Sequence, residues 1–381
     1  MIKWIYQNGI VLYLVNTFLL SIHLTFNFGY NIFLIIMVLY TILLLINPQQ
    51  FKLVILHRAF HFLLILTGLN ILYLIVFDNI SNLESLKYLS ARTIQFTIIP
   101  LSIFYNYEYY KDKFLTHLVF IIFGIVLLGI FLDPFLLSGR YDGIIWNPNA
   151  LASFTVIAFG ILLLKNKEKS NLDYILLIVF LIVSLATGSR GVLVGISLAY
   201  VFRYGFSFRN VLYAVLSIMI YLLLLNLNFD TSLNRIGSQS LFNDRTIQYY
   251  YAIETFLQKP ISGWGLSKYS FLNMDLVPYH LLHSGAIISA HNAYLAIIVQ
   301  YGLIFSSFLF YIIFSKGYEV LYYFRKPKVG YPVIYSYLII YTLIASIYEN
   351  LITGINEFHT ILFWFSLAIL SYSKSESLNA D

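Results

Sequence analysis

The amino-acid sequence predicts an all-α protein that is embedded in a membrane and crosses it many times. Of the 381 residues, 60% are hydrophobic and only 10% are charged, and the mean hydropathy is +0.80. An ordinary soluble domain carries roughly 45–50% apolar and about 25% charged residues. Because so few polar residues cannot cover a water-soluble globule of this length, the composition excludes a soluble enzyme, a disordered chain and a nucleic-acid-binding domain.

The hydrophobic residues form blocks long enough to cross a bilayer, since about 20 helical residues span a hydrocarbon core roughly 30 Å thick. The first block lacks a signal-peptide cleavage pattern, so we expect it to remain as a helix. We predict three regions: transmembrane helices 1–9 in residues 1–229, a large loop in 230–290, and helices 10–12 with a cytoplasmic tail in 291–381. The twelve predicted spans are residues 9–27, 29–47, 60–77, 92–107, 115–132, 149–164, 173–188, 191–204, 210–229, 291–314, 331–349 and 356–373.

The distribution of lysine and arginine predicts the orientation of these helices. With the N-terminus in the cytoplasm, 15 of the 23 basic residues lie on the cytoplasmic side, as the positive-inside rule requires. The net charge of +6 is therefore a topology signal and a contact for anionic membrane lipids, not a nucleic-acid footprint. The 8 basic residues on the predicted outer side are Lys87, Arg92, Arg140, Arg190, Arg235, Arg245, Lys259 and Lys268.

The predicted loop over residues 230–290 is much longer than the others. At roughly 60 residues it is of a length that is uncommon in a loop without a function. Asn243 and Asp244 can cap a helix over residues 245–257, and Pro260 then ends that helix.

A glycine turn follows this predicted loop helix. Gly263 and Gly265 flank Trp264, and closely spaced glycines favour a turn. Because tryptophan prefers the boundary between membrane and water, we expect Trp264 to anchor the turn at the membrane interface.

Four segments on the predicted outer side carry residues suited to a phosphate-linked substrate. Arginine presents a fork of N–H donors that matches phosphate oxygens and keeps its charge at neutral pH. Histidine, whose ordinary pKa is about 6.5, is a natural general base. Charges next to a membrane helix are costly and often functional. The candidates are Arg140 with Asn147 and Asn149, then Arg190, then Arg235 and Arg245 in the long loop, and finally His291 with Asn292.

Each candidate also has a purely structural explanation. Long basic side chains near helix ends reach out to lipid headgroups, and short polar residues cap helices. The large number of tyrosines and phenylalanines is more typical of helix packing than of a carbohydrate-binding surface. The alternatives are a lipid contact for Arg190, ion pairs of Arg140 with Asp142 and of Arg245 with Asp244, and helix capping by Asn147 and by His291 with Asn292.

A metal site is a further alternative, because His280, His283 and His291 lie close together in the sequence. Their spacing lacks a carboxylate-bearing metal motif, so we predict no metal ion and no other cofactor. The chain has no cysteine, which excludes disulfides, thiolate metal sites and cysteine nucleophiles.

Taken in chain order, the segments resemble the O-antigen ligase and polymerase family of bacterial membrane glycosyltransferases. The resemblance covers roughly residues 139–315, and its parts are specific as an ordered set. The matching motifs are Arg140, Gly143 and Asn147 to Asn149; the turn Ser189 to Gly191; Asp244, Arg245, Pro260, Gly263 and Gly265 of the loop; and His291-Asn292 followed by Gly302-Leu303.

The resemblance implies a GT-C-like helical fold in the inner membrane, with the active site on the extracytoplasmic face. The distribution of basic residues places both termini in the cytoplasm. Enzymes of this family take a glycan from undecaprenyl diphosphate and attach it to an acceptor hydroxyl. The resemblance also implies that Arg190 and Arg245 hold the diphosphate, that His291 activates or orients the acceptor hydroxyl with support from Asn292, and that transfer is metal-independent and inverting. Further substrate-binding positions are Arg140, Asn147, Asn149, Arg235 and Asn292.

We predict a polymerase that extends a surface polysaccharide such as O-antigen or capsule. Its partners are an undecaprenyl-diphosphate-linked oligosaccharide, an acceptor glycan, membrane lipids, and a flippase and a chain-length regulator, but no nucleic acid. An O-antigen ligase, which attaches the polysaccharide to lipid A–core, shares the same motifs and stays open as an alternative.

Two alternatives from other classes also stay open. A transporter or flippase places polar groups at mid-membrane depth, whereas here the strongest polar groups gather at the outer boundary. The membrane-buried candidates are few and lie near the last outer turn, at Glu349, Asn350 and Glu357. A non-enzymatic membrane scaffold has no need for arginines and a histidine that face one leaflet.

Overall fold

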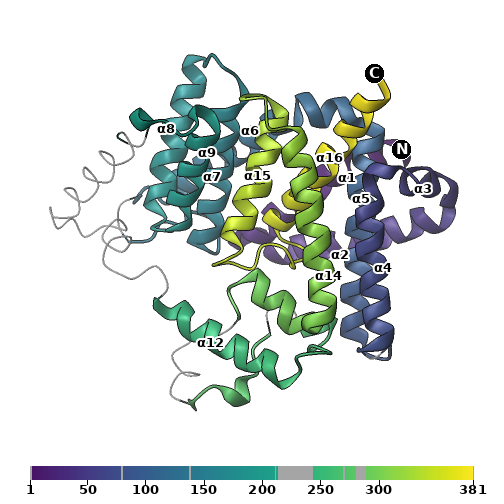
Figure 1. Ribbon diagram of the computed structural model, residues 1–381. Coiled ribbons are helices and arrows are strands. Elements are labelled where there is room, and N and C mark those ends of the chain that lie inside the picture. Colours follow the sequence, from purple (N-terminus) through teal and green to yellow (C-terminus); the bar gives the residue numbers. More distant parts are fainter. Residues whose placement is uncertain are drawn as a thin grey trace.

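The chain folds as a bundle of α-helices, shown in Figure 1. The computed structural model describes residues 2–78, 80–136, 139–210, 212, 243–268, 271–279 and 289–380. These residues form thirteen α-helices, which are α1 (Ile2–Ser21), α2 (Phe26–Ile46), α3 (Pro48–Ile55), α4 (His61–Val76), α5 (Leu83–Asp112), α6 (Phe114–Leu132), α7 (Pro148–Lys165), α8 (Asn171–Ala186), α9 (Gly191–Tyr204), α12 (Asn243–Gln258), α14 (Ala293–Tyr323), α15 (Tyr331–Ala345) and α16 (Phe358–Ala380).

The predicted class, an all-α protein that crosses the membrane several times, is confirmed. Five helical stretches are long and apolar enough to span a bilayer, and α8, α9 and α15 are shorter apolar helices. Each predicted span overlaps a helix except 210–229, which lies almost entirely outside the described residues. The five long stretches are His23–Ile46, Arg58–Val76, Phe114–Leu132, Pro148–Lys165 and Ala293–Tyr323.

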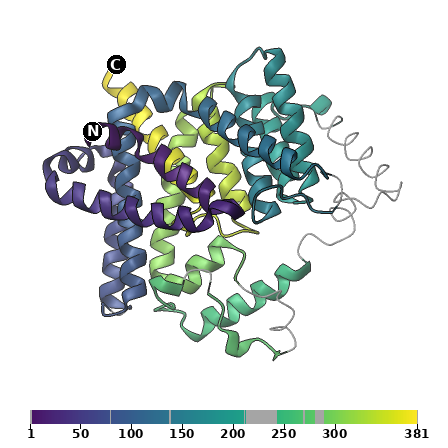
Figure 2. The ribbon, with the colours of Figure 1, turned by 180° about the vertical axis from the view of Figure 1, so that it is seen from behind.

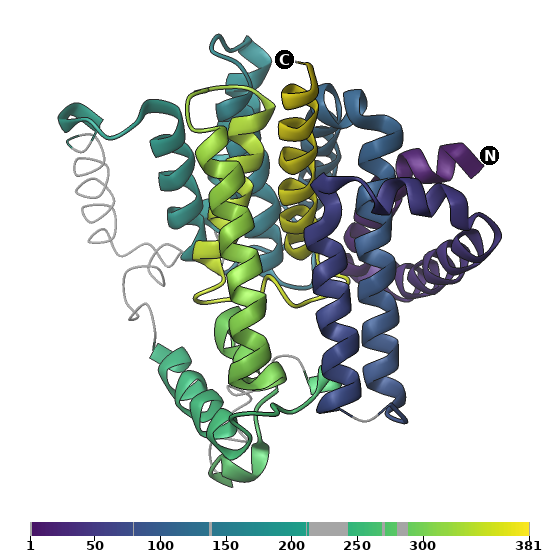
Figure 3. The same ribbon diagram turned by 45° about the vertical axis from the view of Figure 1, so that its right-hand side comes forward.

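The helix α12 packs against α14 at the end of the molecule opposite the chain termini (Figure 1). Figures 1 and 2 show both termini near the top and α12 at the bottom. Figure 3 shows α4, α5 and α14 running upright side by side towards that lower end. The predicted loop helix over residues 245–257 is confirmed by α12, which ends two residues before Pro260. The predicted division of the chain at residues 229 and 290 stays a prediction.

The turn after α12 packs against other residues of the loop region. The indole Nε1 of Trp264 donates to the Thr255 carbonyl oxygen at 2.8 Å, and its ring packs on Phe271. The Lys259 ammonium lies 4.3 Å from the centre of the same ring. The turn is thus as predicted, and the anchoring of Trp264 at the membrane interface stays a prediction.

Two predicted spans differ from the structure in where they begin and how they continue. The predicted span 92–107 is part of α5, a 30-residue helix that starts at Leu83. Arg92, which we expected at the outer boundary, therefore lies more than two turns inside this helix and is only 3% exposed. The predicted span 291–314 is part of α14, whose helix is interrupted at Gly302.

The interruption of α14 joins the loop region to the bundle. Gly302 has φ 67° and ψ 178°, so residues 293–301 and 303–323 are separate helical stretches. Backbone hydrogen bonds from Trp264 to Val299 and from Leu303 to Pro260 hold the turn after α12 against this break in α14. The Tyr73 hydroxyl of α4 lies within 2.7 Å of the Ser262 and Gln300 carbonyl oxygens. It therefore contacts both the turn after α12 and the first part of α14.

We expect Gly302→Ala to destabilise the protein strongly. A Cβ at this position lies 2.1 Å from the Ile261 carbonyl oxygen, and the positive φ is strained for any residue with a side chain. Strain and overpacking of this kind lower the free energy of unfolding by about 1–3 kcal/mol each. Thermal unfolding in detergent measures the effect. Gly317→Ala on the same helix is the matched control, because its Cβ meets nothing within 4 Å; equal melting temperatures of the two variants contradict the assignment.

The bundle is held together by buried tyrosines that donate to backbone carbonyl oxygens of other helices. Tyr40 donates to Ile5, Tyr110 to Gln7 and Tyr335 to Tyr110, all at 2.7 to 2.9 Å. Hydrogen bonds between helices are effective in an apolar surrounding because no water competes for them. For these tyrosines, the prediction that the aromatic residues serve helix packing is confirmed.

Candidate functional site

The Glu349 carboxylate joins two candidate residues that lie far apart in the sequence. Its Oε1 accepts from the Arg245 guanidinium at 2.8 Å, and its Oε2 lies 3.4 Å from Nδ1 of His291. Arg245 is in the first turn of α12, His291 precedes α14, and Glu349 is in the connection between α15 and α16. The side chains of Arg245, Glu349 and His291 are 26%, 25% and 38% exposed, so a substrate can reach them. We call these three residues the Glu349 cluster.

His291 is held in place by the start of α14. Its backbone has φ 40°, a left-handed conformation that is uncommon outside glycine and often marks functional positions. The Asn292 side chain then accepts from the backbone N–H groups of Tyr294 and Leu295 and caps the helix. The Ala293 N–H donates to the Ser346 carbonyl oxygen at 2.9 Å, which fixes the start of α14 beside the end of α15.

A second group of predicted residues reaches the Glu349 cluster through Asn149. The Arg140 guanidinium donates to Asn149 Oδ1 at 2.7 Å and to the Thr187 carbonyl oxygen at 3.2 Å. The Asn149 amide in turn lies 3.5 Å from Glu349 Oε1, at the long limit of a hydrogen bond. Asn147 caps α7 by accepting from the Asn149 N–H at 2.9 Å. The predicted helix-start role of Asn147 is therefore confirmed, and it places Asn149 towards Glu349.

Arg245 is also positioned by Tyr348, the residue before Glu349. The guanidinium carbon lies 5.5 Å from the centre of the Tyr348 ring, within the range of a cation–π contact. The same ring lies against Gly191, where an added Cβ meets the Tyr348 hydroxyl at 3.2 Å. Arg190 directly precedes Gly191 and stands at the start of α9. The turn that carries Arg190 is thus adjacent to the Glu349 cluster.

Two tyrosines next to the Glu349 cluster have raised pKa values. Burial raises the pKa of Tyr348, and the nearby Glu349 charge adds to the effect while Arg245 opposes it. Burial likewise raises the pKa of Tyr249, with Arg245 opposing the shift. Both hydroxyls therefore stay protonated at neutral pH, and the Tyr249 hydroxyl donates to the Ile347 carbonyl oxygen at 2.6 Å.

The structure brings most of the predicted site residues together, with one unexpected member. Arg245 pairs with Glu349 across 104 positions of the chain, whereas the side chain of Asp244, its partner in the ion-pair alternative, lies outside what the structure describes. Glu349 itself was predicted only as a polar residue near the last outer turn, because nothing in the sequence next to it indicates partners in α12 and α14. Arg235, His280 and His283 lie outside the described residues.

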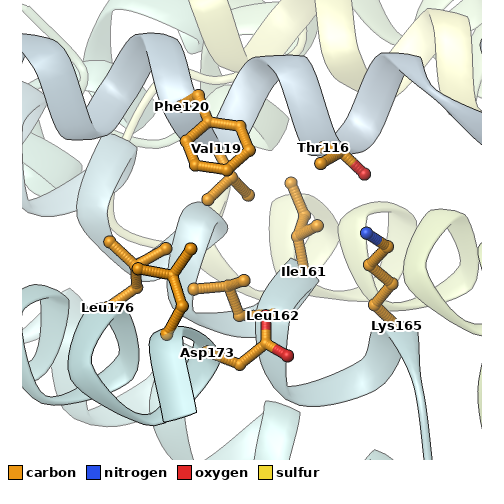
Figure 4. A pocket seen from close by; sticks show the side chains of 9 residues that line it. Thr116, Val119, Phe120, Ile161, Leu162, Lys165, Asp173 and Leu176 are labelled. Atoms are coloured by element: carbon orange, nitrogen blue, oxygen red, sulfur yellow. The ribbon is translucent and has the colours of Figure 1, made fainter. Parts of the chain in front are cut away.

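A pocket of the described residues lies at the other end of α7, far from the Glu349 cluster (Figure 4). It is formed by α6, α7 and α8, and most of its lining is aliphatic. Lys165 and Asn149 are 16 helical residues apart, a distance of about 24 Å along the axis. The charged side chains that line the pocket are Lys165 and Asp173. Asp173 also caps α8 together with Ser170. This pocket is therefore separate from the candidate site.

Within the described ranges, no group of three or more His, Asp or Glu side chains is close enough to hold a metal ion. The Glu349 cluster offers a metal ion only one carboxylate and one imidazole. His291 lies beside one oxygen of that carboxylate, and Arg245 contacts the other. In this arrangement one carboxylate contacts a guanidinium and an imidazole, and all three side chains are partly open to solvent.

The fold and the Glu349 cluster define a membrane protein with an arginine- and histidine-bearing site at the end of the bundle where α12 lies. Residues 175–310 match the family model described as O-antigen ligase. The predicted resemblance to that family of membrane glycan-transferring enzymes is confirmed over this range, which includes Arg190, Arg245, His291 and Asn292. The matched range ends before Glu349. A comparison with curated proteins found no match.

Proposed function

We propose that the protein is a glycosyltransferase that moves a glycan from undecaprenyl diphosphate to an acceptor hydroxyl and thereby extends a surface polysaccharide. The observation that carries the proposal is the Glu349 cluster, in which a histidine base and an arginine share one carboxylate at 3.4 and 2.8 Å. Two of its three members lie in the range that is similar to O-antigen ligases.

The arginines are assigned to the diphosphate of the donor. Among the described residues, Glu349 engages one Arg245 nitrogen at 2.8 Å, and we assign the remaining N–H donors of the Arg245 fork to phosphate oxygens. Arg190 stands one residue from the glycine that contacts Tyr348, and Arg140 is linked through Asn149. Asn147, Asn149, Asn292 and Arg235 are assigned to the surroundings of the bound substrate.

His291 is assigned as the general base. With Nδ1 hydrogen-bonded to Glu349, its Nε2 takes the proton of the acceptor hydroxyl while the hydroxyl oxygen attacks the anomeric carbon of the donor sugar. The bond between that carbon and the diphosphate oxygen breaks, and undecaprenyl diphosphate leaves with the bonding electron pair. The proton then passes from His291 to solvent. A direct displacement of this kind inverts the anomeric configuration.

The proposed reaction uses arginine instead of a metal ion and takes place outside the cytoplasm. Fixed arginine charges stabilise the departing diphosphate, which is the role a divalent cation plays in many other glycosyl transfers. The excess of basic residues on the side of the termini supports a cytoplasmic location for both ends. Since α12 lies at the end opposite the termini (Figures 1 and 2), the Glu349 cluster is then extracytoplasmic. About twelve spans in a GT-C-like arrangement are part of the same proposal.

The test is a transfer reaction with purified protein in lipid vesicles. Given an undecaprenyl-diphosphate-linked oligosaccharide alone, the protein is expected to form longer lipid-linked glycans and release undecaprenyl diphosphate, equally well in EDTA. Transfer that occurs only after lipid A–core is added supports the ligase alternative. If the oligosaccharide lipid crosses the vesicle membrane without any new glycosidic bond, the protein is a flippase and the proposal is wrong.

A further inference from the structure

Arg92 is a buried charge that the proposed reaction does not use. It lies in α5, is 3% exposed and has its guanidinium enclosed by protein on all sides. Among the described residues, no carboxylate lies within ion-pair distance of it. A buried arginine without a carboxylate is costly unless its N–H groups find other acceptors, so its hydrogen-bond partners indicate its role.

The partners of Arg92 are backbone carbonyl oxygens of the connection between α15 and α16, residues 346–357, which we call the 346–357 segment. The guanidinium donates to the carbonyl oxygens of Thr353 and Gly354, the second at 3.0 Å. It also donates to Gln95 Oε1 at 2.6 Å and to the Tyr88 hydroxyl at 3.2 Å, both on its own helix. Its planar fork thus spans from α5 to the segment.

Further contacts fix the same part of the segment. The Tyr13 hydroxyl and the Gln95 amide both donate to the Ile355 carbonyl oxygen, at 2.8 and 3.2 Å. The Asn16 amide donates to Asn356 Oδ1 at 3.2 Å. A non-helical segment enclosed by helices needs such donors because its carbonyl groups have no helical partners. Residues 353–356 are therefore held from α1 and α5.

The held residues are connected to Glu349 by a short path. The Thr353 hydroxyl donates to Asn350 Oδ1 at 2.6 Å, which folds the segment back on itself directly after Glu349. On the other side, the Glu349 N–H donates to the Ala345 carbonyl oxygen at 2.9 Å and continues the end of α15. The position of the Glu349 carboxylate thus depends on two anchors, the end of α15 and the contact of Arg92 with residues 353 and 354.

We infer that Arg92 is a positioning residue that holds the 346–357 segment so that Glu349 reaches both Arg245 and His291. This inference rests on the proposed function for its catalytic consequence, but not for its structural one. Lysine at position 92 keeps the charge and loses the fork, because an ammonium group cannot span the carbonyl oxygens and the two α5 acceptors together. Arg92→Lys therefore isolates the geometry from the charge.

The structural consequence is tested by cross-linking, which needs no substrate. The natural chain has no cysteine. In the double variant Glu349→Cys with His291→Cys, a short bifunctional thiol reagent can therefore react only at these two positions. We expect Arg92→Lys to lower the cross-linking yield at least threefold. Tyr40→Phe, which removes a buried hydrogen bond to Ile5 but no hydrogen bond to residues 346–357, is the matched control and is expected to leave the yield unchanged. An unchanged yield in Arg92→Lys overturns the inference.

The catalytic consequence is tested by a double-mutant cycle on the rate of transfer. If Arg92 acts through Glu349, Arg92→Lys lowers the rate about tenfold in the wild type and less than twofold in the Glu349→Gln background. Equal losses in both backgrounds mean a general effect on the fold and overturn the inference. Should Arg92→Lys not fold, Thr353→Val breaks the same path and is read in the same way. A wild-type protein that transfers no glycan refutes the proposed function alone, since the cross-linking result stands independently.

Discussion

Replacing His291 with alanine is expected to lower the rate of glycan transfer by about 10²–10⁴, the usual contribution of a general base. The physical reason is that no other group among the described residues combines an imidazole with contact to Glu349, here at 3.4 Å. Donor binding is expected to change little, because the diphosphate is held by arginines. The measurement is the initial rate of transfer by purified protein at saturating donor lipid.

The matched control for this experiment is His23→Ala. His23 is exposed just before α2, and its ring lies 3.8 Å from that of Trp146 at a tilted angle, so it shares the residue type without contact to Glu349. Its removal is expected to leave the rate within about twofold, as for most surface substitutions. Similar rates for His291→Ala and His23→Ala contradict the role of His291 as base.

Replacing Arg245 with alanine is expected to reduce transfer by about 10²–10³, comparable to removing one donor from an oxyanion site. The change removes both a phosphate-binding fork and the 2.8 Å partner of Glu349. We expect much of the loss to appear as a raised KM for the donor lipid. Arg245→Lys is expected to recover part of it, because it restores the charge and not the bidentate geometry.

The matched control for Arg245 is Lys259, at the opposite end of α12. Lys259 is exposed just after α12, with its ammonium over the Trp264 ring. If bulk positive charge near the membrane attracts the donor lipid, Lys259→Ala and Arg245→Ala lower transfer alike. If Arg245 binds the diphosphate directly, as we propose, Lys259→Ala keeps a rate close to that of the wild type.

Most of the fold could be predicted because hydrophobic blocks and the signals that start and stop helices depend on residues close together in the sequence. The cap at Asn147, the loop helix α12 and the stop before Pro260 all follow from neighbours within a few positions. The break at Gly302 could not be predicted this way. It depends on a contact with the turn at Gly263, about forty residues earlier in the chain, and the hydrophobic pattern runs through it without a gap.

The candidate site was predicted in part for the same reason. Arg245 and His291 lie in recognisable sequence motifs, and each was predicted as a site residue from the residues next to it. Glu349 has no motif around it, and its function comes only from α12 and α14 meeting the end of α15. Arg92 was misplaced because a single arginine at the edge of a hydrophobic block is typical of a loop, whereas the carbonyl oxygens of residues 353 and 354 allow it to be buried.

The most direct test of the Glu349 cluster is to measure donor binding and transfer separately in the two single variants. With purified protein in vesicles, binding of undecaprenyl-diphosphate-linked oligosaccharide and its single-turnover transfer are followed for His291→Ala and Arg245→Ala. We predict that His291→Ala binds the donor like the wild type and does not transfer, and that Arg245→Ala binds it at least tenfold more weakly. Transfer at the wild-type rate by His291→Ala, or undiminished binding by Arg245→Ala, contradicts the account.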